Sequence, residues 1–328
     1  MLSFLHMLNR MSFIFKNGYT LLSNCQYDPF SCQRYDTDFN FLIELNNCVF
    51  SMNCVYSGSG GILYISNTQK NLRISNSVFF SCHVSSNFDG GAIYLVANSS
   101  NLQNICAYYC SSRYFLFGFL DCLYENYLGF LSITKCNEVF SGVHPIAMVR
   151  GFQVIKSLNS SYNKVLQSSG FGNNIPSNFL MEYCQLSNNQ AQTSICLHLH
   201  GNKGTISFIN IIHNNSPNSY GVSLFDGSAQ YALDNVVASN NTDILLYSTS
   251  GQVLVSESFI FHTNQIISGP IQIQTNCIFE FTNAIHINFY STHLCESENR
   301  LPLFTGYHKM KIILGMFIVF GIISSELY

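Results

Sequence analysis

The residues best suited to hold a metal ion lie in the segment Cys196-Leu197-His198-Leu199-His200. Thiolate and imidazole groups are preferred ligands of zinc and related ions. On a strand, alternate residues share one face, so Cys196, His198 and His200 would lie in one line. That line spans roughly 13 Å, which is too long for all three to meet at one ion. We therefore expect outward-facing strand residues, with these three as weak metal candidates, and we predict no metal and no cofactor.

A second segment suggests acid/base chemistry. Asn241-Thr242-Asp243 resembles the Asn-Thr-Asp element of polygalacturonases. Glycoside hydrolysis needs two carboxylates on either side of the scissile bond. The paired Asp, the Gly-His-Gly and the Arg-Ile-Lys of that family are missing, and the nearest fragments are His200-Gly201 and Lys311-Ile312. We predict no catalytic residue and a protein that is not an enzyme, with a polysaccharide hydrolase or lyase as the alternative.

Four Asn-x-Ser/Thr sequons, the acceptor pattern for N-linked glycans, begin at Asn98, Asn159, Asn214 and Asn240. The last two belong to a regular series of Asn and Cys residues and are expected to point inward. Asn98 and Asn159 are expected in turns. The sequence therefore predicts glycosylation at Asn98 or Asn159 in an exported protein.

That regular series indicates the architecture. Nine times, an apolar or small residue is followed three positions later by Asn or Cys, as in Phe50/Asn53 and Phe79/Cys82. The intervals shorten from 29 residues (Asn53 to Cys82) to 24 (Asn240 to Asn264). A period in the twenties is typical of a solenoid, in which each repeat forms one coil. The predicted ladder column consists of Asn53, Cys82, Cys110, Cys136, Asn163, Asn188, Asn214, Asn240 and Asn264.

Short alternating runs bounded by Gly, Asn and Ser clusters predict the strands of each coil. Phe41–Leu45 and Leu72–Ile74 are examples of the first strand, and Gly61–Ile65 and Ala92–Val96 of the second. The predicted fold class is all-β, a single-stranded right-handed parallel β-helix of about nine to ten coils. Asn amides in register can hydrogen-bond from coil to coil, and Cys is small enough to take the same place.

The ends of the chain differ from its middle. We expect an N-terminal cap or irregular first coil over 1–40, the β-helix over 41–290, and a cap or stalk over 291–308. Residues 309–328 are apolar. The run 312–325 is shorter than the 17–25 residues that usually span a bilayer. Membrane attachment through this truncated anchor and a buried strand or cap helix are the two alternatives. A signal peptide is not evident at the N-terminus.

Composition excludes some classes of function. Charged residues make up 9% of the 328 residues and the formal net charge is −3, so no basic surface for nucleic acid is expected. The chain holds 13 Cys and no CxxC pair. We expect Cys82, Cys110 and Cys136 to be buried thiols rather than disulfides between coils. Cys25, Cys32, Cys277 and Cys295, near the ends of the solenoid, are better disulfide candidates.

Two coils carry a family resemblance. Phe50-Ser-Met-Asn53 followed by Gly60-Gly61-Ile62, and Phe79-Phe-Ser-Cys82 followed by Gly90-Gly91-Ala92-Ile93, resemble the FxxN and GGA(I/L/V) motifs of chlamydial polymorphic outer-membrane proteins. The repeats also resemble the β-helix surface proteins of trichomonad protists, within the pectin-lyase-like superfamily. The resemblance implies a right-handed β-helix, a place on the cell surface and a role in adhesion, and it supplies no catalytic residues.

The sequence thus leaves three functional hypotheses. The first is a non-enzymatic cell-surface or secreted protein, with or without a membrane anchor, that contacts a host or cell-surface protein or glycan. Its contacts would come from the turn loops Tyr109–Phe130, Gly170–Asn178 and Ser216–Tyr220. The second is a carbohydrate-binding or polysaccharide-active protein. The third is a partial gene product without an independent function.

Overall fold

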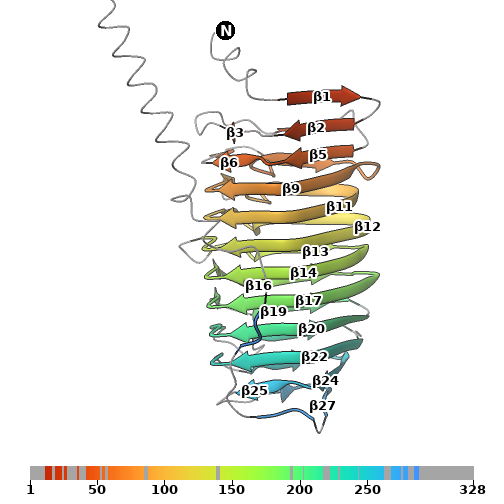
Figure 1. The fold of residues 1–328 in the computed structure, drawn as a ribbon. Coiled ribbons are helices and arrows are strands. Elements are labelled where there is room, and N and C mark those ends of the chain that lie inside the picture. Colours follow the sequence, from red (N-terminus) through yellow and green to blue (C-terminus); the bar gives the residue numbers. More distant parts are fainter. Residues whose placement is uncertain are drawn as a thin grey trace, which may run out of the picture. The chain divides into compact units, whose positions relative to one another are not determined.

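The stacked coils expected from the repeat are present. The computed structural model describes residues 12–16, 19–23, 26–27, 35–36, 42–51, 54–55, 58–84, 88–137, 141–192, 195–201, 203–216, 222–227, 230–242, 244–261, 267–274, 276–279 and 284–287. Over these residues the chain is all-β and forms a parallel β-solenoid, whose strands stack one above another (Figure 1). The predicted fold class is confirmed, with about eight turns where nine to ten coils were expected.

The strands are β1 (Ser12–Lys16), β2 (Tyr19–Ser23), β3 (Gln26–Tyr27), β4 (Tyr35–Asp36), β5 (Leu42–Asn46), β6 (Val49–Ser51), β7 (Cys54–Val55), β8 (Leu63–Ser66), β9 (Asn71–Phe80), β10 (His83–Val84), β11 (Ile93–Tyr108), β12 (Phe115–Thr134), β13 (His144–Val149) and β14 (Phe152–Ser161). They continue with β15 (Lys164–Val165), β16 (Ser168–Asn174), β17 (Asn178–Ser187), β18 (Gln190–Ala191), β19 (Ile195–His200), β20 (Lys203–Ile212), β21 (Ser223–Asp226), β22 (Gln230–Ser239), β23 (Leu246–Ser248), β24 (Gln252–Ser256), β25 (Phe259–Phe261), β26 (Ile267–Ser268) and β27 (Ile271–Ile273).

Each coil contributes to three faces. Face A runs from β8 through β13, β16, β19, β21 and β23 to β26, and face B from β5 through β14, β17, β20, β22 and β24 to β27. Face C is formed by β6 and by the second halves of the long strands. Strands β11 and β12 are long enough to pass through all three faces.

The first strand interrupts this parallel order. β1 pairs antiparallel with β2, from Ser12 opposite Ser23 to Lys16 opposite Tyr19, whereas β2 pairs parallel with β5. β1 thus covers the edge of the first described coil, as a solenoid end requires. The N-terminal cap predicted over 1–40 includes this strand.

Two columns of left-handed residues turn the chain from face to face. The first bend, between faces B and C, is formed by Asn47, Asn76, Asn104, Phe130, Ser157, Tyr183, Phe208, Asn235 and Glu257. The second bend follows face C and is formed by Ser81, Tyr109, Lys135, Tyr162, Asn188, His213 and Asn240, with φ between 49° and 58° at each. Asn adopts this conformation at low cost, whereas a larger side chain loses roughly 1–2 kcal/mol. We call the outer row at the second bend the ridge.

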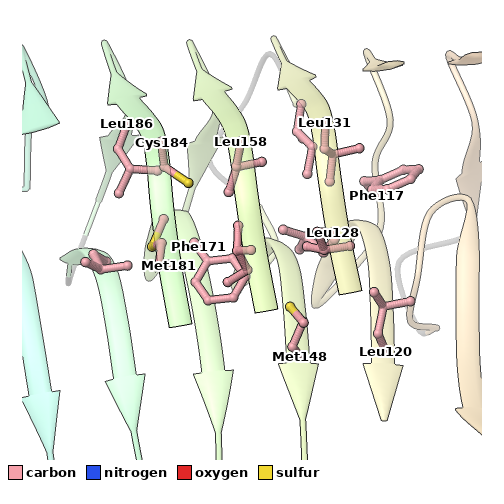
Figure 2. Close-up of a cluster of buried hydrophobic side chains, with 14 of the residues drawn as sticks. Phe117, Leu120, Leu128, Leu131, Met148, Leu158, Phe171, Met181, Cys184 and Leu186 are labelled. Atoms are coloured by element: carbon pink, nitrogen blue, oxygen red, sulfur yellow. The ribbon is translucent and has the colours of Figure 1, made fainter. Parts of the chain in front are cut away.

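The interior is a dry stack of apolar side chains. Figure 2 shows Phe117, Leu120, Leu128, Leu131, Met148, Leu158, Phe171, Met181, Cys184 and Leu186, contributed by successive coils, and all of them are fully buried. Burying one such side chain stabilises the fold by about 1.5–3 kcal/mol. Apolar residues alternate with polar ones within the short strands, as in β5 and β8, which is why the sequence revealed them.

The glycine pairs of the two resembling coils have separate tasks. Gly60 and Gly90 have φ of 73° and 67°, which suits glycine. At Gly91 a Cβ atom would run into the carbonyl oxygen of Leu116 on the next coil. Gly61 faces Gly91 O in the same way. The motif therefore supplies one left-handed turn and one close approach of two backbones.

The predicted contact loops are largely strands. Tyr109–Phe130 runs mostly within β12, where Leu116, Phe117 and Leu120 are buried. Gly170–Asn178 lies mostly in β16, and Phe171 points into the core. Long strands passing through three faces leave little chain for loops, so these two predictions are wrong. Of Ser216–Tyr220, only Ser216 is described, and it is buried.

The contact pattern divides the chain into Met1–Tyr290 and Ser291–Tyr328. The predicted cap or stalk over 291–308 and the apolar segment 309–328, with its possible anchor at 312–325, lie outside the described residues. Within the described part of the chain, no helix is long and apolar enough to cross a membrane.

Candidate functional site

Directly after the ridge, a buried column of Asn side chains joins consecutive coils. It consists of Cys82, Cys110, Cys136, Asn163, Asn189, Asn214 and Asn241. From Cys136 onward, the backbone N–H of each column residue donates to the side-chain amide oxygen of the next coil, with distances of 2.9 Å for Cys136 to Asn163 and 3.0 Å for Asn163 to Asn189. The same bonds continue from Asn189 to Asn214 and from Asn214 to Asn241, at 3.1 and 2.9 Å.

Each Asn of the column also donates back to the preceding coil. Asn163 Nδ2 bonds Ile133 O at 3.1 Å, and Asn189 Nδ2 bonds Ser160 O at 2.8 Å. Asn214 and Asn241 repeat the bond to Leu186 O and Ile211 O. The column therefore satisfies backbone groups that are buried at every bend.

Two members of the predicted column are corrected by one residue. Asn188 and Asn240 lie on the ridge, and their neighbours Asn189 and Asn241 occupy the column. The reason is that each pair is an Asn-Asn doublet, in which the first residue takes the left-handed bend and the second turns inward. Asn53 and Asn264 lie outside the described residues.

The thiols of the column are all buried. Cys82, Cys110 and Cys136 lie in the core without disulfides. Cys277, predicted as a disulfide candidate, is also a buried free thiol, because it packs against the last coil of the core. Cys25, Cys32 and Cys295 lie outside the described residues. Cys106, which the sequence did not single out, is disulfide-bonded.

The three weak metal candidates do not form one set of ligands. Cys196 is fully buried in the core, where its Sγ lies 4.0 Å from Asn189 Nδ2, whereas His198 and His200 are only partly buried. A register shift between β16 and β19 explains the change of face. No group of three His, Cys, Asp or Glu side chains suited to a metal occurs among the residues described.

A pair of histidines lies on the outer side of face A. The His144 and His198 rings are 6.0 Å apart, and the His198 Nε2 atom lies 4.0 Å from Asp226 Oδ2. Gly172 allows this, since a Cβ atom there would collide with the His144 ring. Desolvation lowers the pKa of His144 to about 3, and nearby His198 adds to the effect. Desolvation also lowers the pKa of His198, opposed by Asp226. Both rings are therefore neutral at pH 7.

The ridge is hollowed over four consecutive coils. An open groove of about 370 Å³ is lined by Tyr109, Lys135, Asn137, Tyr162, Lys164, Asn188 and Gln190. Tyr109, Lys135 and Tyr162 stand on consecutive coils, so the two tyrosines are about 10 Å apart. Tyr162 is 54% exposed.

Neighbouring rings hold the groove's lysine in place. Lys135 Nζ donates to Tyr108 OH at 3.1 Å and lies 5.3 Å from the centre of that ring. The Tyr108 and Tyr109 rings meet edge to face, with their centres 4.3 Å apart. The described lining of the groove contains two lysines and no carboxylate. An anionic group is therefore the ligand that this groove suits best.

A second groove lies on the outside of face B. Its volume is about 400 Å³, and Lys203, Gln230, Gln252 and Gln272 supply most of its long side chains. Lys203, Gln230 and Gln252 are in register on β20, β22 and β24. Amide groups both donate and accept, so this groove suits a neutral polar ligand.

Asn98 and Asn159, the predicted glycan acceptors, have different surroundings from those expected. Asn241 belongs to the buried column, and Asp243 lies outside the described residues. Asn98 lies in β11 and Asn159 in β14, not in turns. The Asn159 side chain is 2% exposed and donates to Ser132 Oγ.

Comparison with known proteins leaves the chain without a family assignment. No protein-family model matches it. No curated protein matches it. No solved structure matches it.

Proposed function

We propose that the chain is a non-enzymatic cell-surface protein whose ridge binds an acidic glycan. The observation that carries this proposal is the groove of about 370 Å³ with its two tyrosines, two lysines and three amides. The spacing of Tyr109 and Tyr162, about 10 Å, is close to the length of two sugar units in an extended chain. One sugar would pack on each ring, and Lys135 and Lys164 would contact carboxylate or sulfate groups.

The backbone of the ridge supports a role for these side chains. Tyr109, Lys135 and Tyr162 occupy left-handed positions where Asn188 and Asn240 stand on other coils. Because the bend itself favours Asn or Gly, local conformation does not explain the Tyr and Lys residues. Side chains that the backbone does not require are consistent with a binding surface.

The chemistry of the grooves favours binding over catalysis. Hydrolysis of a glycan needs a pair of carboxylates, and elimination needs a base beside the sugar. Neither groove has a carboxylate among its described lining residues. The part of Asn241-Thr242-Asp243 that is described serves the column. These points support a protein that holds a glycan without cleaving it.

Export is part of the same proposal. Disulfides persist in oxidising compartments, and Cys106 forms one. A surface rich in Ser and Asn, with only 9% charged residues in the whole chain, agrees with exported solenoids. The right-handed coil and kinship with the trichomonad and chlamydial surface proteins also belong to this proposal, supported by the glycine pairs Gly60-Gly61 and Gly90-Gly91.

Binding is tested with heparan sulfate and polygalacturonate as acidic probes and dextran as the neutral probe. The double variant Tyr162→Ala, Lys164→Ala should lose at least tenfold in affinity for an acidic probe. The matched control is Tyr183→Ala, because Tyr183 is 45% exposed at the other bend. Equal affinities for the wild type and the double variant would contradict the proposal, as would failure to bind either acidic probe.

Export is tested separately by antibody labelling of intact and permeabilised cells. Signal on intact cells supports a surface protein, whereas signal only after permeabilisation refutes the location without affecting the affinity measurements.

The second candidate function is binding of a neutral polysaccharide in the groove on the outside of face B. That function would be favoured if the double variant Gln230→Ala, Gln252→Ala lost dextran binding while the double variant Tyr162→Ala, Lys164→Ala kept it.

A further inference from the structure

The four sequons differ in whether the folded protein can carry a sugar on them. N-glycosylation requires an Asn and a hydroxyl residue two positions later, and the bulky product must lie at the surface. In three of the four, the hydroxyl residue is buried. Ser100, Ser161 and Ser216 are 3%, 2% and 0% exposed.

The Asn residues of those three sequons are also engaged. Asn98 Nδ2 donates to Asn71 Oδ1 at 3.0 Å, and Asn159 Nδ2 donates to Ser132 Oγ at 3.0 Å. Asn214 is 1% exposed and holds three coils together through Asn189, Leu186 and Asn241. A sugar on Asn214 would remove it from the column and leave the N–H of Asn189 buried without a partner.

Asn240 has the opposite surroundings. It is exposed on the ridge with φ of 53°, a conformation that Asn tolerates well. Its neighbour Asn241 turns inward and anchors the bend, so the Asn240 side chain has no part in the column. Thr242 is exposed as well, and its Oγ1 bonds Ser216 N at 3.0 Å and Asn215 Oδ1 at 3.0 Å.

We propose that Asn240 is the N-glycan acceptor of this protein, and that Asn98, Asn159 and Asn214 carry no sugar in the folded chain. The proposal rests on the export included in the proposed function. The glycan would stand on the ridge three coils beyond Tyr162, about 14 Å from it. It would therefore border the groove lined by Tyr109, Lys135 and Tyr162.

The experiment directs the full chain into the secretory pathway of cultured eukaryotic cells with a cleavable leader. The secreted protein is treated with peptide-N-glycosidase in ¹⁸O water, so that each formerly occupied Asn appears as labelled Asp in peptide mass spectra. We expect label at Asn240 and none at the other three sequons. An unlabelled Asn240, or label at Asn98, Asn159 or Asn214, would overturn the proposal.

Two variants separate the site from folding. Asn240→Gly destroys the sequon and keeps a residue that favours positive φ, so it should remove the gel shift of one glycan from a secreted protein. Asn188→Gly, at the matching ridge position two coils earlier, should leave the shift unchanged. Chain retained inside the cell is mapped in the same way from the membrane-enclosed fraction. Because the leader forces export, cytosolic location in the native cell would refute only the proposed location.

Discussion

At the scale of residues, position relative to the left-handed bend residue decides the role of each Asn side chain. Asn188 and Asn189 are chemically identical neighbours, yet the first is a left-handed bend residue on the surface and the second is fully buried. Asn189 Oδ1 accepts from Asn163 N, and its Nδ2 donates to Ser160 O. Asn188 contributes only its conformation to the column.

This difference predicts opposite outcomes for adjacent substitutions. Asn189→Ala leaves two buried backbone groups without partners, so we expect a loss of about 2–4 kcal/mol in the free energy of unfolding. Asn188→Gly keeps the favoured φ and should change stability by less than about 0.5 kcal/mol. Urea unfolding followed by circular dichroism measures both. If Asn188→Gly lowered the free energy of unfolding more than Asn189→Ala does, our assignment of Asn189 to the column would be wrong.

The sequence predicted the column's existence but not its full membership. The spacing identified Cys82, Cys110, Cys136 and Asn163, because single Asn or Cys residues leave no choice of register, and it also identified Asn214, the first residue of the doublet Asn214-Asn215. At the doublets, both residues satisfy the same pattern, and only the hydrogen bonds of the folded coil distinguish them. The ridge groove was missed for a related reason. Tyr109, Lys135 and Tyr162 do not repeat one residue type, and only their register, one residue before each column member, brings them together.

At the scale of elements, the close approach between coils depends on particular glycines. The pair Gly90-Gly91 precedes β11, and the second glycine lies against the backbone of Leu116 and Ser111 on the next coil. Gly118 lies within β12 opposite Ile93 and Ile146. A Cβ atom at Gly118 would make only ordinary contacts of 3.8 Å, with Ile93 Cβ and O.

These two glycines form a matched pair for mutation. Gly91→Ala forces two backbones apart, and we expect a loss of about 1–3 kcal/mol. Gly118→Ala adds a methyl group without collision and restricts the unfolded chain, so it should be neutral or stabilising by up to about 1 kcal/mol. Thermal unfolding of both variants beside the wild type provides the comparison. If the two alanines cost the same, tight stacking at Gly91 is not the reason for the motif.

The sequence indicated these elements unevenly. Short strands such as β5 and β8 alternate cleanly and were identified. Of the long strands, only the start of β11 was predicted, as Ala92–Val96. Both β11 and β12 cross an irregularity in register between faces A and B and a left-handed bend between faces B and C, and the apolar pattern changes phase at each. Tyr109–Phe130 therefore resembled an aromatic loop. At Tyr109 and Phe130 the backbone bends in the left-handed conformation. Neither position carries the Gly or Asn that usually marks such a bend in a sequence.

At the scale of the whole molecule, buried ionisable groups limit the pH range of stability. Desolvation raises the pKa of Cys122, Cys184 and Cys196 to about 12, against about 9 in the unfolded chain. These thiols stabilise the fold below pH 9, and the contribution is lost as the pH rises toward 12. Desolvation lowers the pKa of His144 to about 3, so its contribution is present above pH 6.5 and is lost as the pH falls toward 3.

We therefore expect maximal stability between about pH 6.5 and pH 9, with a slope of up to about 1.4 kcal/mol per pH unit from each group beyond these limits. Urea unfolding at pH 4.5, 7.5 and 10 measures the profile. His144→Phe, which keeps the ring stack with Phe115, should flatten the acid side alone, and Cys184→Ala the alkaline side alone. If the stability of both variants changed with pH as it does in the wild type, these groups would not set the limits of the pH range of maximal stability.

The direction of the hydrogen bonds in the Asn column has a consequence for synthesis and for evolution. Asn163 completes the bend at Cys136, and Asn189 completes the bend at Asn163, so from Cys136 to Asn214 each described bend is completed by the coil that follows it. A chain interrupted within this part of the column therefore ends in a bend whose backbone N–H lacks its partner. An insertion or deletion that keeps these hydrogen bonds between coils therefore has to add or remove one complete coil.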